Sequence, residues 1–377
     1  MFKRKRLKKL NILHVAPSLN AKDGGISTFV SGLTNSLKNF SNFYLITTKS
    51  QNKDKLFNIN TKNFFYFKES FNLYKNYKII KFLIDQNISK KKIDIIHIHG
   101  LWSFVNYLIS KYALKNNIPL IIHPHGMLES WALNRKFLKK KIAYLFYQKK
   151  ILQKANVIIA SSKKESDSIK KLGLKKNIKI IPNGINFFKK KILRKYNRKI
   201  LNALVLSRLH PGKGIDDLIK SWSSINQNKW HLNIVGDGFA NYVNYLKKLK
   251  NTFDYQNNIT FLGYYGHDKK KKILKNSDLF ISPSYSENFG LSIIEALNYG
   301  LPVITTTKTP WGKIKDYQCG WIIEPGKESL NKLLPRILFS KSFMLQSYSR
   351  KAYKFSKKFD WKIITKEYFK LYIKLSK

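Results

Sequence analysis

Two glutamates carry the side chains best placed to do chemistry in this chain: Glu287 and Glu295, eight positions apart. Gly290 lies between them, and apolar runs at Leu279–Ile281 and Val303–Thr306 flank the segment. This pattern predicts a strand, a loop, a helix that carries Glu295, and a second strand. In a parallel α/β sheet such a loop lies at the carboxyl edge, where ligands bind. A carboxylate among apolar neighbours needs a partner, so the segment is either a binding site or a helix with one solvent-facing glutamate.

A second loop places two cations near each other. The run Ala203–Ser207 predicts a strand, Arg208 follows it directly, and Lys213 comes five residues later across a Pro-Gly turn. Of the 72 basic residues only 8 are arginine, the residue that pairs best with phosphate. Because a helix is predicted just after Lys213, we expect both cations to bind one diphosphate beside its N-terminus. Ordinary surface charge is the alternative.

Glycine-containing loops follow other predicted strands. Gly24 and Gly25 precede a predicted helix, where backbone N–H groups can face an anion, although their spacing matches neither a dinucleotide fingerprint nor a P-loop. Gly236 stands in a Gly-Asp-Gly loop that permits close approach of a base or ribose. Backbone N–H groups are also expected at the helix start after Glu287, from Asn288, Phe289, Gly290 and Leu291.

Four histidines end two predicted strands: His97 and His99 end one, and His123 and His125 end the next. Imidazole is the commonest metal ligand, but neither pair lies on a helix face and no carboxylate cluster accompanies them. We therefore expect no metal site and interpret them as a polar rim around a substrate cleft. His125 is the candidate that touches substrate, whereas His97 and His99 are structural or line the acceptor site.

The net charge of +51 raises the question of nucleic-acid binding. The excess is almost entirely lysine, and asparagine and isoleucine are abundant as well, a composition typical of an AT-rich genome. No helix-turn-helix, zinc or RNA-binding pattern is present, so we expect no nucleic-acid partner. Residues 1–190 hold 38 basic and 8 acidic side chains, and we expect this basic first half to face an anionic membrane surface.

The segment Arg135–Lys154 carries eight basic residues and no acidic ones, with apolar residues at helical spacing. A basic amphipathic helix is typical of elements that lie on a membrane surface. A solvated helix in a lysine-rich protein is the other interpretation.

Composition bounds the class of protein. The hydrophobic content of 43% is that of a globular chain, and no apolar run reaches the roughly 18 residues of a membrane span. A single cysteine, Cys319, excludes a disulfide framework and a cysteine-based zinc site. The basic stretch Met1–Lys9 leads into a strand-like run too short for a secretory signal. We expect a cytoplasmic protein that can associate peripherally with the inner face of the membrane.

Short apolar strands alternate with helical stretches along the whole chain, which predicts two doubly wound parallel sheets. We expect one Rossmann-like domain at residues 1–188, a second Rossmann-like domain at 189–355, and a C-terminal helix at 356–377 that returns toward the first domain. The predicted strands are Ile12–Ala16, Phe43–Thr47, Ile95–His99, Leu120–His123, Val157–Ala160, Ile178–Ile181, Ala203–Ser207, Leu232–Val235, Thr260–Leu262, Leu279–Ser282 and Pro302–Thr306.

These motifs together resemble the retaining GT-B glycosyltransferases of family 4, the glycosyl transferases group 1, whose two domains face an interdomain cleft. The resemblance covers the chain from about residue 11 to the C-terminal helix. The block His123–Leu133 and the pair Thr309–Trp311 and Cys319–Trp321 resemble a subgroup that builds bacterial exopolysaccharide, capsule or O-antigen. Gly312 departs from that subgroup, which usually has a larger or acidic residue there. The family motifs are matched by Gly24-Gly25, His125-Gly126, Arg208 with Lys213, and Glu287-x7-Glu295.

The resemblance implies that the second domain, 189–355, binds the nucleotide-sugar donor and that the first, 1–188, is the acceptor side. It also implies a role for each residue. Glu295 binds the donor ribose, Arg208 and Lys213 neutralise the diphosphate, and Glu287 holds the sugar with backbone groups near Phe289. His125 contacts the sugar, and Gly24 and Gly25 allow approach to the phosphates.

The activity implied is a retaining, metal-independent transfer of sugar from a nucleotide-sugar to a lipid-linked saccharide in cell-surface polysaccharide synthesis, with no cofactor. No residue is required as a covalent nucleophile, which favours a front-face route. The alternatives are another GT-B reaction, such as a sugar-phosphate synthase, or a charge-driven nucleic-acid-binding protein.

Overall fold

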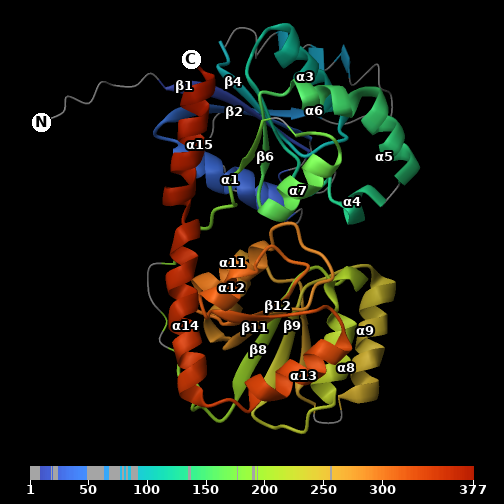
Figure 1. Cartoon of the computed structure of the whole chain (residues 1–377), viewed down its shortest axis with the longest axis vertical. Helices are drawn as coiled ribbons and strands as arrows, with labels where there is room; N and C mark the ends of the chain where they lie inside the picture. Colours follow the sequence, from blue (N-terminus) through green and yellow to red (C-terminus); the bar gives the residue numbers. More distant parts are fainter. Residues whose placement is uncertain are drawn as a thin grey trace, which may run out of the picture. The chain divides into compact units, whose positions relative to one another are not determined.

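The computed structural model describes residues 9–17, 19, 24–48, 63–67, 77–78, 80–81, 84–85, 92–134, 137–175, 177–188, 192, 194–254 and 257–377. The chain forms two compact units (Figure 1). Unit 1 comprises Met1–Asn186 with Trp361–Lys377, and unit 2 comprises Phe187–Asp360. The sequence predicted domain boundaries after residues 188 and 355, whereas the two units divide after residues 186 and 360. Part of the predicted linker, at 189–191 and 193, lies outside the described residues.

Unit 1 contains a seven-stranded parallel sheet in the order β3-β2-β1-β4-β5-β6-β7. This order, with its reversal at β1, is that of a doubly wound sheet. β3 was not predicted from the sequence; the other strands were, within two residues at each end. The strands are β1 (Leu10–Ala16), β2 (Ser41–Thr48), β3 (Asn63–Phe67), β4 (Ile95–His99), β5 (Leu120–His123), β6 (Val157–Ala160) and β7 (Ile178–Ile180).

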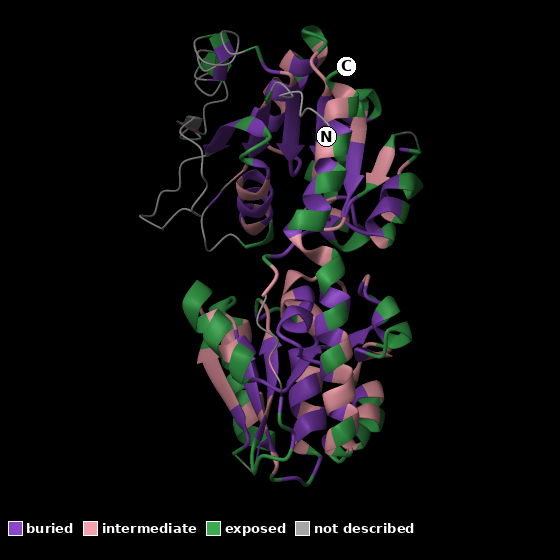
Figure 2. Ribbon diagram, turned by 90° about the vertical axis from the view of Figure 1, so that its left-hand side faces the viewer, coloured by how far each residue is buried: buried purple, intermediate pink, exposed green. Residues whose placement is uncertain are grey.

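Helices cover both faces of this sheet. α3, α6 and α7 bury their apolar residues on one face, and α1 and α15 bury theirs on the other. Figure 2 shows the buried strands in purple between helices whose outer surfaces are partly or fully exposed. The helices of unit 1 are α1 (Gly25–Leu37), α3 (Phe104–Lys115), α4 (Ser130–Asn134), α5 (Phe137–Ala143), α6 (Lys149–Lys154), α7 (Lys163–Lys171) and α15 (Trp361–Leu375).

The C-terminal helix α15 groups with unit 1 and lies beside α1 (Figure 1); it begins at Trp361, not at the predicted residue 356, which ends α14. Trp361 at its start packs against Phe29 of α1, with ring centroids 5.5 Å apart. A Cβ atom at Gly32 or at Gly184 would lie less than 3.0 Å from the Trp361 ring. Both glycines are therefore needed because the indole occupies the space that a side chain would fill.

Unit 2 contains a six-stranded parallel sheet in the order β10-β9-β8-β11-β12-β13. β13 was not predicted as a strand. The strands are β8 (Leu201–Leu206), β9 (Trp230–Val235), β10 (Ile259–Gly263), β11 (Leu279–Ser282), β12 (Val303–Thr306) and β13 (Gly320–Ile323). The helices are α8 (Ile215–Ser223), α9 (Ala240–Phe253), α10 (His267–Asn276), α11 (Leu291–Asn298), α12 (Lys313–Asp316), α13 (Lys327–Leu338) and α14 (Ser342–Ser356).

The predicted basic helix at Arg135–Lys154 is interrupted in the structure. α5 passes into a π-helical segment at Tyr144–Gln148 before α6 begins, and residues 135–136 lie outside the described range. Among the described residues, no helix combines the length and the apolarity that crossing a bilayer requires.

Candidate functional site

The loop after β8 carries both predicted phosphate-binding cations. Arg208 is exposed at the start of this loop. Lys213 lies in a 3-10 turn that spans Pro211–Lys213, and Gly214 then adopts a left-handed conformation (φ +62°) before α8 begins. A Cβ at Gly214 would lie less than 3.0 Å from the Pro283 carbonyl oxygen. Only glycine therefore allows this loop to pack closely against the loop after β11.

The loops after β8 and β11 are joined at the carboxyl edge of the sheet. Tyr285 N donates to Gly212 O at 2.9 Å, and Lys213 forms an ion pair with Glu287 in which both side chains are more than four-fifths buried. The Ser284 hydroxyl donates to the same Glu287 carboxylate at 3.4 Å. The structure thus brings Lys213 and Glu287 together, although they are 74 positions apart.

Glu295 has a partner that we did not predict. Lys270 of α10 lies with its Nζ 2.6 Å from Glu295 Oε1, and both side chains are mostly buried. This ion pair explains how a carboxylate is kept among apolar neighbours on α11. The sequence offers no signal for Lys270, since it stands in a run of four lysines, 269–272.

The start of α11 is shaped by Gly290 and Trp311. Gly290 has φ +76°, and the Trp311 indole N–H donates to the Phe289 carbonyl. Phe289 is buried, while Asn288 and Leu291 are partly exposed. The predicted run of backbone N–H groups is therefore held in place by an indole from the segment before α12.

The glycines after β9 have a structural explanation different from the expected one. A Cβ at Gly236 would lie less than 3.0 Å from Ser207 O, and one at Gly238 less than 3.0 Å from Leu209 O. Leu209 N also donates to Asp237 O at 2.8 Å. Both glycines thus allow the loop after β9 to pack against the segment that carries Arg208.

In unit 1, Gly24 and Gly25 are exposed at the start of α1. Gly24 has φ +78° and precedes the helix, and its carbonyl accepts hydrogen bonds from Thr28 N and Thr28 Oγ1, both at 3.1 Å. Most of the preceding predicted loop, at residues 18 and 20–23, lies outside the described residues.

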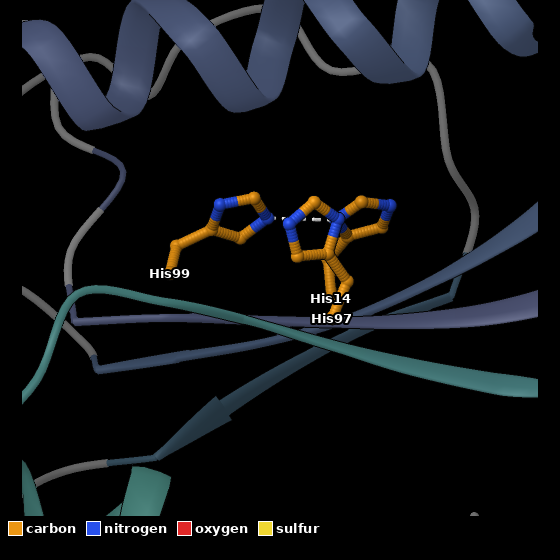
Figure 3. A group of neighbouring side chains, drawn as sticks. All are labelled: His14, His97 and His99. Carbon is orange, nitrogen blue, oxygen red and sulfur yellow. Dashed lines mark hydrogen bonds between the residues drawn. The ribbon is translucent and has the colours of Figure 1, made fainter. Parts of the chain in front are cut away.

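A cluster of histidines is buried beneath α1 and α15. His14 is paired in register with His97, and His99 with His123, while His97 and His99 are two apart on β4 and so share one face. All four side chains are fully buried, and Figure 3 shows His14, His97 and His99 grouped on one side of the strands. The register places His97, His99 and His123 under α1 and α15, away from any exposed rim. This burial agrees with the structural role that was one of the two expectations for His97 and His99.

Burial keeps these imidazoles neutral. Desolvation lowers the pKa of His14 and of His125 to about 3. The pKa values of His97, His99 and His123 are also well below the ordinary value, first through burial and then through neighbouring histidines.

His125 lies at the margin of this cluster and is the one of the five that is partly exposed. Its backbone has φ +52°, an unusual value for a residue with a side chain. Its ring stacks on that of His123, with ring centroids 3.7 Å apart, and meets the Phe29 ring edge-on, with centroids 5.0 Å apart.

Glu165 fixes the loop after His125 and was missed in the sequence analysis. Its buried carboxylate accepts hydrogen bonds from Gly126 N, Ser161 N and the Ser161 hydroxyl. Ser162 Oγ in turn accepts from Glu165 N at 3.1 Å. The Ser162-x-x-Glu165 spacing is that of a capping box, which was a readable signal for this helix start.

The histidine cluster also contains two groups of side chains close enough together to hold a metal ion, while the sequence analysis expected no metal site. Ligand nitrogens of His14, His97 and His99 lie within 4.8 Å of one another, as do those of His99, His123 and His125. No carboxylate belongs to either described group.

Comparison with known proteins identifies both halves of the chain. A model of the glycosyl transferases group 1 matches residues 184–355, and a model of glycosyltransferase family 4 matches residues 23–187. The two family models meet at the division between the two compact units.

Individual relatives agree with these models. An uncharacterized glycosyltransferase of Methanocaldococcus jannaschii is 30% identical over 363 residues, covering 94% of this chain and 95% of the relative. An uncharacterized 41.2 kDa protein from the cps region of Klebsiella pneumoniae is 25% identical over 315 residues, covering 78% of this chain and 80% of the relative. The crystal structure of Anabaena HepE with UDP and glucose has the same fold, with a TM-score of 0.78 at 17% identity over 97% of this chain and all of that one. The chain therefore belongs to the family 4 glycosyltransferases and is a glycosyltransferase with the two-domain GT-B fold.

Proposed function

We propose that the protein transfers a sugar from a nucleotide-sugar donor to a saccharide acceptor, with retention of anomeric configuration and without a metal ion or cofactor. The observation that carries the proposal is the Lys213–Glu287 ion pair, which joins two loops at the carboxyl edge of the unit 2 sheet. Such an edge is where open α/β sheets bind ligands. The HepE complex supports a uridine nucleotide as the donor carrier.

In this proposal Arg208 and Lys213 bind the donor diphosphate. They stabilise the negative charge that develops when the bond between the anomeric carbon and the phosphate oxygen breaks. Lys213 pairs with Glu287 in the structure, and in this proposal the donor diphosphate replaces that carboxylate as the partner of Lys213. Glu287, released from Lys213, accepts hydrogen bonds from sugar hydroxyls together with the backbone near Asn288, Phe289, Gly290 and Leu291.

Glu295 accepts hydrogen bonds from the ribose hydroxyls, and the ion pair with Lys270 holds its carboxylate in place for that role. From unit 1, His125 contacts the sugar, and the backbone at Gly24 and Gly25 contacts the phosphates. Gly236 acts through packing, because it allows the Arg208 loop to adopt its conformation.

The reaction itself needs no covalent intermediate on the protein. The acceptor hydroxyl attacks the anomeric carbon on the face from which the phosphate departs, and its proton passes to the leaving phosphate oxygen. The protein supplies charge stabilisation and orientation, which are the larger contributions in such transfers.

We propose a lipid-linked saccharide at the inner membrane face as the acceptor, within cell-surface polysaccharide synthesis. The Klebsiella relative from a cps region supports the pathway. The surface of α5 and of the π-helical segment after it supports an association with the membrane. Leu138 is 72% exposed and Phe146 is 82% exposed, with Ile142 and Leu145 exposed between them, and lysines flank this apolar strip. No nucleic-acid partner is proposed.

A panel of nucleotide-sugars tests the donor. The true donor should raise the melting temperature of the full chain by mass action and be hydrolysed slowly without acceptor. Arg208→Ala and Lys213→Ala should abolish both effects, whereas Arg336→Ala, an exposed arginine of α13, should not. Stabilisation that persists in both site variants would contradict the assignment, and so would a requirement for added metal.

A further inference from the structure

Three imidazoles form a continuous hydrogen-bonded chain in unit 1. His14 Nδ1 lies 2.8 Å from His99 Nε2, and His99 Nδ1 lies 3.1 Å from His125 Nε2. The rings of His14 and His99 are inclined by only 9°, and Figure 3 shows the bond between them. The chain runs from the interior of the sheet to His125 at its margin.

A chain of neutral imidazoles has a direction. Each ring has one N–H donor and one acceptor nitrogen, and His99 uses both of its nitrogens within the chain. If His99 accepts from His14, it must donate to His125; if it donates to His14, it must accept from His125. All three tautomers are therefore coupled, and only two arrangements are possible.

His14 decides between these two arrangements. Its second nitrogen, Nε2, is buried and has no hydrogen-bond partner among the described residues. If the donors pointed toward His14, its proton would lie on Nε2 and an N–H group would be buried without an acceptor. With the proton on Nδ1, His14 bonds to His99 and leaves only a bare ring nitrogen, and no N–H group, unpaired in the interior. We therefore assign the proton of His14 to Nδ1.

We propose that His14 and His99 are positioning residues that hold His125 as the Nδ1–H tautomer, with its Nε2 occupied as an acceptor. Nδ1–H is then the group that His125 offers at the margin of unit 1, and its partner is an acceptor oxygen of the donor sugar. This part of the inference rests on the proposed function, in which His125 contacts the sugar.

The surroundings of His125 support this role. Its left-handed backbone is unfavourable for a residue with a side chain and persists only where neighbours hold it. Stacking on His123, contact with Phe29, and the Glu165 hydrogen bond to Gly126 N provide that support. Orientation and tautomer are thus specified by separate contacts.

Long-range ¹H–¹⁵N spectra of the ¹⁵N-histidine-labelled full chain test the tautomers directly at pH 7.5, with no donor present. Protonated and bare ring nitrogens have well-separated shifts, and single substitutions assign the signals. We expect His14, His99 and His125 each to carry the proton on Nδ1. The opposite tautomers, or a comparable mixture of both at His125, would overturn the proposal.

His14→Leu removes the first donor, and His97→Leu is its matched control. His97 is the register partner of His14 and equally buried, but it bonds to the Tyr372 hydroxyl at 2.9 Å instead of joining the chain. His14→Leu should give a mixture of tautomers at His125, His14→Asn should restore one tautomer through its amide donor, and His97→Leu should leave it unchanged. If both leucine variants changed the His125 tautomer equally, the loss of a buried side chain would explain the effect without any hydrogen-bonded chain, and the inference would be overturned.

Transfer kinetics separate this inference from the proposed function. We expect kcat/KM for the donor to fall roughly fivefold in His14→Leu, as for the loss of one hydrogen bond, and to recover in His14→Asn. If the tautomers are as predicted but His125→Ala transfers sugar normally, the proposed role of His125 fails and the imidazole chain stands. Stoichiometric Zn²⁺ uptake that shifts the His14 and His99 signals would overturn the chain, because a metal requires both facing nitrogens to be bare.

Discussion

Lys213, after β8, and Glu287, after β11, form an ion pair at the carboxyl edge of the unit 2 sheet. Gly214 follows Lys213 directly, and its missing side chain leaves room for the Pro283 carbonyl, so that the two loops can approach. The pair means that the proposed phosphate-binding cation and the proposed sugar-binding carboxylate respond to each other.

The first prediction concerns that coupling. Lys213→Ala and Glu287→Gln should each lower kcat by roughly 10²- to 10³-fold, as for the loss of one charge-stabilising contact. Because the two side chains contact each other, the double variant should lose less than the product of the single effects. Steady-state transfer rates measure this, with the exposed Lys332→Ala of α13 as the control. Strict additivity would contradict a shared site.

The second prediction concerns Glu295. Glu295→Gln keeps the shape of the side chain but removes the charge that Lys270 and the ribose hydroxyls share. Donor affinity should fall roughly 10- to 100-fold, as for hydrogen bonds to a charged group, when measured by titration calorimetry.

Two further variants serve as a comparison and a control for the donor affinity of Glu295→Gln. Lys270→Met should weaken donor binding less than Glu295→Gln does, since Lys270 acts through Glu295. Glu328→Gln, an exposed glutamate of α13, should bind donor normally. Unchanged affinity in Glu295→Gln would remove Glu295 from the site.

The third prediction concerns pH. The pKa of His14 is about 3 in the folded protein against an ordinary value of 6.5, so the unfolded chain binds more protons between these values. The contribution of His14 to the free energy of unfolding is therefore complete above pH 6.5 and is lost as pH falls toward 3, at about 1.4 kcal/mol per pH unit.

Urea unfolding between pH 5 and 7.5 measures this slope. His14→Leu should have a shallower slope than the unsubstituted protein below pH 6.5. Ile159→Val, a buried change in the same core, should lower stability without changing the slope. Equal slopes in all three proteins would mean that His14 is protonated normally in the folded state.

The fourth prediction concerns Gly236. Its φ of +151° is accompanied by a carbonyl, that of Ser207, in the space a Cβ would fill. Gly236→Ala should destabilise the protein by about 1–3 kcal/mol, the typical range for a strained backbone site, and weaken donor binding through displacement of the Arg208 loop. Thermal unfolding and calorimetry measure both effects.

Gly312→Ala is the matched control for Gly236→Ala. Gly312 has helical backbone angles, and no atom lies within 4 Å of its Cβ position. It should be neutral in both measurements. Full stability and donor affinity in Gly236→Ala would show that the loop after β9 is less rigid than its contacts imply.

The fifth prediction concerns the membrane. Phe146→Ser removes an exposed ring from the proposed membrane-facing surface and should lower the partition coefficient for anionic phosphatidylglycerol vesicles by roughly tenfold or more, given about 1.5–3 kcal/mol for burial of such a side chain. Phe343→Ser, equally apolar and 70% exposed on α14 of unit 2, should change it little. Vesicle sedimentation at physiological salt measures the partition coefficients of both variants. Equal losses in the two would point to non-specific binding.

The scarcity of arginine drew attention to Arg208, but the structure shows that scarcity alone does not mark a ligand site. Arg194 is almost fully buried and donates to three carbonyls, those of Leu274, Lys275 and Tyr299. A guanidinium has five N–H donors, which suit it both to binding a phosphate and to binding buried carbonyl oxygens. The position of Arg208 at a strand end, rather than its rarity, separates the two.

The sequence by itself determined the two parallel α/β domains and most of their strands, because apolar runs bounded by turn residues are a local signal. It also located the motifs at strand ends, where parallel sheets gather their loops. β3 and β13 were missed although each contains a short run of strand-favouring residues, Phe64–Phe67 and Trp321–Ile323, like the runs that identified the other strands.

Only the tertiary structure decided which side chains meet. The pairs Lys213–Glu287 and Lys270–Glu295 and the histidine cluster all join residues from different strands or helices. Their partners follow from strand order, register and helix packing, which link positions far apart in the chain. His14 illustrates the point: it lies within a predicted strand, yet its role depends on the register that sets it beside His97 and on α1 and α15, which exclude water from both.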